Sequence, residues 1–347
     1  MTDVLVVSAV TNASMPAMAC VSEFEETILD TFQCDHVRLS EGESIEHGKR
    51  YKVVFVVAIS FSQLVQMLRK LRKYRLGGKL VAFVFDAFLS RRYMKLPSIL
   101  REWTSYHKVI SSLDCLYTPM LSLVDFYKET LGVEIQFLPI GVDALKYGYG
   151  GSEGRWVDVN GYGRQPPEVT RVLSDFYNTG RNGFFYHTNH MKIQMLTDIA
   201  QHRAMFWQLL RSSRLALAYS PESFDPDKRF ECSFVGQRWF ESLAAGCVVV
   251  GKRPSATEVD ELLDWEDSTI DLPDDAESAL EEILGLSKQN DRIEAAARRN
   301  HSMVLARHDW RFRIEAMAND FCPQLQAEAS AAADKAREAG DRVLNSI

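Results

Sequence analysis

The chain has 347 residues, a length that favours two domains of the usual size. Its hydrophobic content of 46% and charged content of 25% are typical of a soluble globular enzyme. Its formal net charge of −7 argues against a general nucleic-acid binder. The six cysteines show no close pairs, and no apolar run is long enough to span a bilayer, so we expect a reduced, cytoplasmic protein without a zinc knuckle or a disulfide framework.

Strands and helices are predicted to alternate through the first half of the chain. The apolar runs that predict strands are Val4–Val10, Val53–Ile59, Lys79–Phe85, Cys115–Thr118 and Val133–Leu138. The segments that predict helices are Ala19–Phe32, Phe61–Tyr74, Pro97–Tyr106 and Leu121–Leu131. Alternation of this kind requires crossover connections, so residues 1–146 are predicted to form an α/β domain with a parallel sheet.

A glycine-rich stretch, residues 147–154, predicts a linker to a second α/β domain at residues 155–307. The expected strands there are Trp156–Tyr162, Phe184–His187, Leu215–Tyr219, Cys247–Val250 and Thr269–Leu272. The expected helices are Pro167–Tyr177, Ala200–Ser212, Ser233–Ala245, Ala276–Leu286 and Asp291–Ala306. A further helix is expected within residues 308–324, and residues 325–347 predict a solvated tail, which is either a solvated helix or a frayed end.

The helix expected at residues 233–245 carries charge beside a buried strand. Ser233 is expected to cap its first turn, and Gly246 to end it in the left-handed conformation. Arg238 and Glu241 are three residues apart and share one side of this helix. A cation and a carboxylate at the carboxyl edge of a parallel sheet suit a ligand with phosphate and sugar hydroxyls. The alternative interpretation is a surface ion pair.

Four segments together resemble the GT-B glycosyltransferases of group 1, particularly the CgeB/YkvP-like type. These segments are Arg238–Gly246, Leu138–Asp143, Gly161–Arg164 and His308–Arg313. The resemblance implies two doubly wound Rossmann-like domains that face each other across a cleft, with a C-terminal helix that crosses back to the first domain. It also implies that Glu241 contacts the ribose of a nucleotide and that Arg164 contacts its diphosphate. Ser233 stands where retaining members have a second glutamate, so the stereochemical outcome stays open.

The function that the resemblance implies is transfer of a sugar from a UDP- or GDP-sugar to a hydroxyl of a glycan, lipid-linked or small-molecule acceptor. Such an enzyme of the hexosyltransferase type, active in polysaccharide or glycolipid synthesis, is expected to need no metal or other cofactor, because arginines can neutralise the leaving diphosphate. Two alternatives stay open. One is a GT-B-shaped epimerase or phosphorylase, and the other is a GT-B-like protein that binds a nucleotide or a partner without catalysis.

Seven residues are expected to form the site. Asp86, at the end of a buried strand, is the expected catalytic base, with a helix cap or turn aspartate as the alternative. The expected donor-binding residues are Arg164, His187, Ser220, Arg229, Arg238 and Glu241. For the arginines the alternative is an ordinary surface position, and for His187 it is a structural role.

Two basic segments of the first domain, Arg69–Arg75 and Arg91–Lys95, form a local positive patch on an acidic protein. This pattern predicts peripheral attachment to an anionic membrane surface on the cytoplasmic side, which would bring a lipid-linked acceptor to the site. The alternative is a solvated helix face whose apolar side packs on the sheet.

Overall fold

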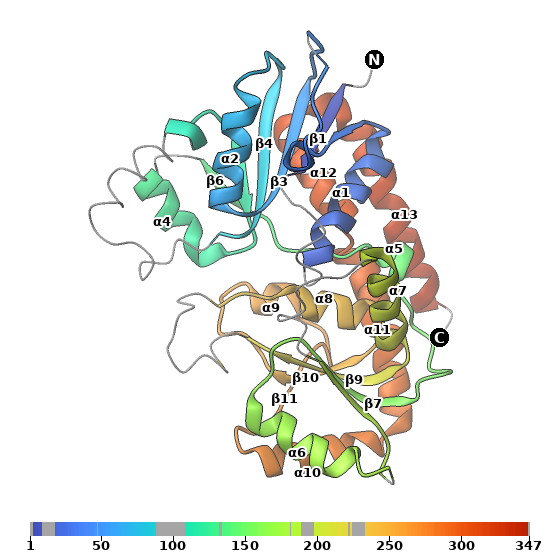
Figure 1. The fold of residues 1–347 in the computed structure, drawn as a ribbon. Helices are drawn as coiled ribbons and strands as arrows, with labels where there is room; N and C mark the ends of the chain where they lie inside the picture. The colour runs from blue at the N-terminus through green and yellow to red at the C-terminus, as the bar shows by residue number, and fades with distance from the viewer. Residues whose placement is uncertain are drawn as a thin grey trace, which may run out of the picture. The chain divides into compact units, whose positions relative to one another are not determined.

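The computed structural model describes residues 3–8, 18–46, 48–87, 108–131, 134–180, 182–188, 198–220, 223 and 233–345. The chain divides into two compact units. The first contains the described residues up to Ile140 together with Trp310–Ala333, and the second contains Gly141–Asp309 and the described residues from Asp334 onward. Each unit is built on one parallel sheet (Figure 1), so the predicted fold class of two α/β units is confirmed.

The first unit has a six-stranded sheet in the order β2-β1-β3-β4-β5-β6. Its strands are β1 (Val4–Ser8), β2 (Asp35–Val37), β3 (Val53–Ser60), β4 (Lys79–Asp86), β5 (Cys115–Thr118) and β6 (Ile135–Phe137). Its helices are α1 (Ala19–Phe32), α2 (Phe61–Leu71), α4 (Leu121–Leu131) and α12 (Trp310–Phe321), with short 3₁₀ turns at η3 (Leu39–Glu41) and η7 (Pro323–Leu325). The expected helix at residues 97–106 lies outside the described residues.

An aromatic cluster joins α12 to the core of the first unit. Trp310 is fully buried, and its ring centroid lies 4.4 Å from Phe24 of α1, 6.2 Å from Phe83 and 5.8 Å from Phe85 of β4. Arg313, one turn later in α12, donates to the carbonyl oxygens that follow β6 in this unit (2.9 and 3.1 Å). The segment after residue 309 is therefore an integral part of the first unit's core.

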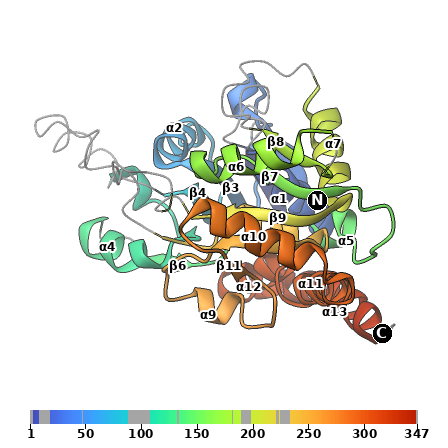
Figure 2. The ribbon, with the colours of Figure 1, turned by 90° about the horizontal axis from the view of Figure 1, so that it is seen from below.

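The second unit has a five-stranded sheet in the order β11-β10-β9-β7-β8. Its strands are β7 (Val157–Tyr162), β8 (Phe185–Thr188), β9 (Ser213–Tyr219), β10 (Val248–Lys252) and β11 (Ile270–Asp271). Its helices are α5 (Ala144–Tyr147), α6 (Pro167–Tyr177), α7 (Ile199–Arg211), α8 (Gln237–Ala244), α9 (Val259–Leu262), α10 (Ala276–Ser287) and α11 (Asn290–Arg307). Helices α6 and α10 pack together on one face of the sheet, whereas α8 and α11 pack on the other (Figures 1 and 2).

Helix α8 differs from its prediction at one end only. It begins at Gln237 with Gly236 in the cap position and no side-chain cap, so the prediction that Ser233 caps it is wrong. The Ser233 hydroxyl instead accepts a hydrogen bond from the main-chain N–H of Ser255 (3.0 Å). Gly246 has φ +70 and lies next to the main chain of Tyr149, so the predicted left-handed stop after the helix is confirmed.

The stretch predicted to be a solvated tail forms the helix α13 (Gln326–Asn345). Its alanines Ala329, Ala333 and Ala336 are fully buried, so one face of this helix packs against the protein while its charged face is exposed. The helix starts in the first unit and continues into the second, because the division between the units falls after Ala333.

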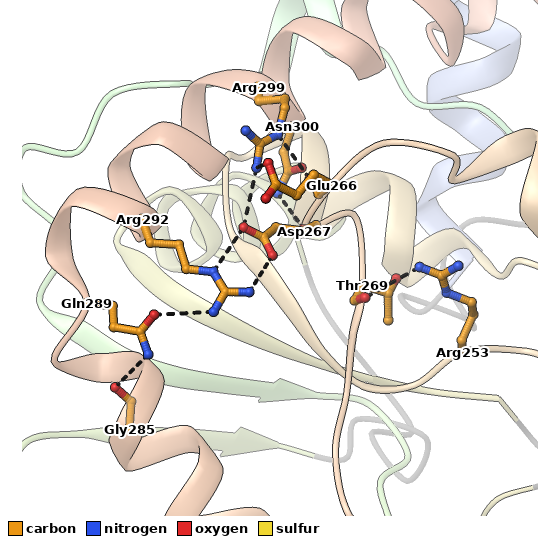
Figure 3. A network of polar contacts seen from close by, with 9 residues as sticks. All are labelled: Arg253, Glu266, Asp267, Thr269, Gly285, Gln289, Arg292, Arg299 and Asn300. Carbon is orange, nitrogen blue, oxygen red and sulfur yellow. Dashed lines mark hydrogen bonds and ion pairs between the residues drawn. The ribbon is translucent and has the colours of Figure 1, made fainter.

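A polar network stiffens the second unit around α11 (Figure 3). The buried carboxylate of Asp267 accepts two hydrogen bonds from Arg292 (2.7 and 3.1 Å) and one from Arg299 (3.3 Å), both on α11. Two residues further on, Thr269 accepts a hydrogen bond from the indole N–H of Trp239 in α8 (3.1 Å). The loop before β11 thus fixes α8 relative to α11, and with it the charged side chains that α8 carries.

Candidate functional site

The carboxyl edge of the second unit's sheet has its topological switch point at β7. Strand β7 lies between β8 and β9, so the connections after β7 and β9 leave in opposite directions and open a crevice where they part. Gly163 and Arg164 follow β7 directly, and α8 is the next described helix after β9. Residues from both sides of the switch point can therefore reach one ligand.

Arg238, in the first turn of α8, contacts the segment after β7. Its Nη1 donates to the main-chain oxygen of Arg164 (3.0 Å). Gly163 has φ +79, and a Cβ at this position would lie 2.5 Å from Nη2 of Arg238. A glycine is therefore required here both for the backbone conformation and for the close approach of the guanidinium. The structure brings Arg164 and Arg238 together, and their predicted contact with a diphosphate stays a prediction.

The charge state of Arg238 follows from its surroundings. Burial, and to a lesser extent the neighbouring Arg164, lower the pKa of this guanidinium to about 10, although Glu241 acts in the opposite direction. Arg238 therefore remains a cation at neutral pH. Within the described part of the chain no carboxylate forms an ion pair with it. A half-buried cation without a carboxylate partner is stabilised most by an anionic ligand that binds to it from solution.

Glu241, one turn after Arg238, forms a buried ion pair with Arg203 of α7. The two side chains are 6% and 9% exposed. The predicted alternative of a surface pair between Arg238 and Glu241 is not what the described residues form. Sequence reasoning missed Arg203, although an arginine three and four positions before Phe206 and Trp207 was a signal of a cation on an apolar helix face.

Two other predicted donor-site residues, His187 and Ser220, lie at or next to the ends of β8 and β9, the strands that flank β7. His187, near the end of β8, is exposed and its ring stacks on Phe185 at 5.7 Å; burial of part of the ring lowers its pKa, so it is neutral at neutral pH. Ser220 follows β9, is fully buried, and its hydroxyl has no hydrogen-bond partner among the described residues. Arg229 lies outside the described residues, as does the basic segment Arg91–Lys95.

Asp86, the predicted base, belongs to the first unit. It is the last residue of β4, pairs in register with Ser60 at the end of β3, and is partly exposed. Asp86 thus lies at the carboxyl edge of the first sheet, which is where ligands bind in open α/β sheets.

A second polar cluster lies at the end of β1, which is the switch point of the first sheet. Ser8 Oγ donates to Glu25 Oε2 (2.6 Å) and lies 2.7 Å from Nε2 of His36. Burial raises the pKa of Glu25 to about 7, although the Ser8 hydrogen bond and Arg38 act in the opposite direction. Burial and Arg38 lower the pKa of His36. The carboxyl group is therefore half protonated near neutral pH, and the imidazole is neutral.

We expect the free energy of unfolding to fall as the pH rises from about 4.5 to about 7, because unfolded Glu25 has already lost the proton that the folded protein keeps. Substitution Glu25→Gln should remove this fall, which amounts to up to about 3 kcal/mol. Urea unfolding of the wild-type protein and of Glu25→Gln at pH 5, 6, 7 and 8 measures the difference between their free energies of unfolding. The opposite contribution of His36 is present in both proteins and largely cancels in this difference. A difference that does not change over this pH range would contradict the prediction.

Part of the second unit is similar to a known protein family. Residues 175–319 match the model of a family described as glycosyl transferase-like, a segment that contains Arg203, Arg238 and Glu241. The matched segment covers less than half of the chain, and it includes the Arg238–Gly246 segment on which the resemblance in the sequence partly rests. The fold of the chain can be compared with the crystal structure of WaaG, a glycosyltransferase involved in lipopolysaccharide biosynthesis, at a TM-score of 0.48 and 12% identity over 91% of this chain and 98% of that chain. No curated protein matches the sequence.

Within the described residues, none of the helices is both long and apolar enough to cross a bilayer. Among the same residues, no three histidine, cysteine or acidic side chains gather in a way that could hold a metal ion.

Proposed function

We propose that the protein transfers a sugar from a nucleotide-sugar donor, a UDP- or GDP-sugar, to a hydroxyl group of a glycan, lipid-linked or small-molecule acceptor, with no metal ion required. One observation supports this most: Arg238 is a half-buried guanidinium at the switch point of a parallel sheet, without a carboxylate partner among the described residues. It lies in the segment that matches the glycosyltransferase-like family. A diphosphate supplies the anion that this position favours.

In the proposed reaction the bond between the anomeric carbon of the sugar and the diphosphate oxygen breaks while the acceptor oxygen bonds to that carbon. Negative charge develops on the leaving diphosphate, and Arg238 and Arg164 stabilise it. Glu241 accepts a hydrogen bond from a ribose hydroxyl and so orients the nucleoside. The acceptor hydroxyl loses its proton to Asp86. His187, Ser220 and Arg229 are proposed to contribute further donor contacts.

The proposed acceptor unit also carries a basic surface on α2. Arg69 of α2 and Lys73, which follows this helix, are exposed, whereas Leu64, Val65 and Leu68 of α2 are buried. Because the apolar face is already covered, we propose that an anionic membrane is bound by charge alone, without insertion. Cosedimentation with phosphatidylserine vesicles that disappears in about 0.5 M salt would support this, and binding that salt does not weaken would overturn it.

The donor assignment is tested with a panel of UDP-, GDP-, dTDP- and CMP-sugars. At least one should raise the melting temperature of the protein and be hydrolysed or transferred when acceptors are supplied. Binding without turnover over all acceptors would favour the alternative of a non-catalytic nucleotide-binding protein, and no thermal shift with any nucleotide would overturn the proposal.

Substitution Asp86→Asn tests the proposed base. We expect turnover to fall about 10²-fold, the lower part of the range for a positioned base, because water can still accept the proton slowly. The affinity for the donor should stay the same, because the donor residues belong to the other unit. Turnover is measured under donor saturation, with Asp125→Asn, an aspartate on α4, as the matched control. Unchanged turnover in Asp86→Asn would remove this residue from the mechanism.

A further inference from the structure

Arg203 is held in place by more than its ion pair with Glu241. Its guanidinium lies over the ring of Phe206, with 4.3 Å to the centroid, and over the ring of Trp207 at 5.0 Å. Trp207 in turn stacks on Tyr147 with centroids 4.9 Å apart and an interplanar angle of 1°. The guanidinium therefore packs against two aromatic rings as well as pairing with Glu241.

Glu241 has two arginines close enough to attract its carboxylate, Arg203 and Arg238. Arg238 and Glu241 are three residues apart on α8, and such pairs attract each other across one helical turn. The structure nevertheless pairs Glu241 with Arg203, which comes from a different helix. Glu241, Arg238 and Phe206 line one small enclosed space, which has no room for a water molecule. A carboxylate that turned toward Arg238 would neutralise the cation that is proposed to meet the diphosphate.

We infer that Arg203 is a positioning residue of the donor site: it draws the Glu241 carboxylate away from Arg238, so that the carboxylate faces the ribose and the Arg238 guanidinium keeps its charge for the diphosphate. This inference rests on the proposed function, because it assigns Arg203 to the same donor site.

Inorganic pyrophosphate and UDP are the probes that separate the two effects, because pyrophosphate has no ribose. In Arg203→Met, we expect pyrophosphate to bind about tenfold more weakly, since Glu241 then pairs with Arg238. In the double variant Arg203→Met/Glu241→Gln, pyrophosphate affinity should return to that of Glu241→Gln alone, because no carboxylate is left to compete. UDP should bind weakly in all three variants, because each disturbs the ribose contact. Isothermal titration calorimetry measures all of these affinities.

A merely structural Arg203 gives a different pattern. Pyrophosphate binding would then stay weak in the double variant, and that result would overturn the inference, as would unchanged pyrophosphate binding in Arg203→Met. Arg203→Gln, which keeps donors but loses the charge, is expected to give the same weakening and serves if the methionine variant does not fold. Failure of the wild-type protein to bind either UDP or pyrophosphate would instead overturn the proposed function itself, so the two failures are distinguishable.

Discussion

Replacing Arg238 by alanine is expected to weaken nucleoside diphosphate binding, and to lower kcat/KM for sugar transfer, by about 10²–10³-fold. The physical reason is the state of this guanidinium. It is half-buried, it remains protonated because its pKa is lowered only to about 10, and its described hydrogen bond goes to a neutral carbonyl. A charge placed in this way interacts strongly with a diphosphate, since little water screens the pair.

The measurement is calorimetric titration of the nucleotide that the sugar panel selects, with thermal melting to show that the variant is folded. Arg171→Ala is the matched control: Arg171 belongs to the same unit, but it is exposed on α6 and pairs with Glu168 (3.1 Å) and Asp175 (3.4 Å). Such surface pairs contribute little, so the control should bind like the wild-type protein. Equal affinities of the two variants would show that Arg238 does not hold the diphosphate.

Arg238→Lys refines this result. A lysine keeps the charge but cannot reach the Arg164 carbonyl and a phosphate with the same planar fork. We expect it to recover only part of the affinity. Full recovery would indicate that charge alone acts here, without the directed hydrogen bonds of a guanidinium.

Replacing Trp310 by alanine is expected to lower the free energy of unfolding of the first unit by about 3–5 kcal/mol. The indole is fully buried among three phenylalanine rings, from α1 and β4, at centroid distances of 4.4 to 6.2 Å. Its removal leaves a cavity that rings held by a helix and a strand are unable to fill. The effect is large because the missing side chain joins the segment after residue 309 to the sheet.

Urea unfolding followed by circular dichroism measures this loss. Trp156→Ala is the control, because Trp156 is 59% exposed and its removal opens no cavity. Trp310→Phe should lose less than the alanine variant, since it retains most of the aromatic volume. A Trp310→Ala variant as stable as the Trp156→Ala control would mean that α12 adds nothing to the core of the first unit.

The sequence by itself determined the class of fold and the main motif of the candidate site. Strands such as Val53–Ser60 and Val248–Lys252 begin as apolar runs, as strands covered on both faces do, and the helices between them follow the helical period. Gly246 ends α8 in a left-handed conformation that few other residues adopt, so its role was predictable from its position. These features depend on residues that are close together in the sequence, so the sequence alone is enough to predict them.

Only the tertiary structure decided which charged groups meet. Arg203 and Glu241 are 38 residues apart, and Ser8 and His36 are 28 apart, so no local period relates them. The start of α8 is a further example, because Ser233 bonds to Ser255 across the sheet edge in place of capping the helix. The buried alanine face of α13 likewise became visible only through its packing. Pairing over such separations is set by the packing of whole elements, and the pattern of a single element does not contain it.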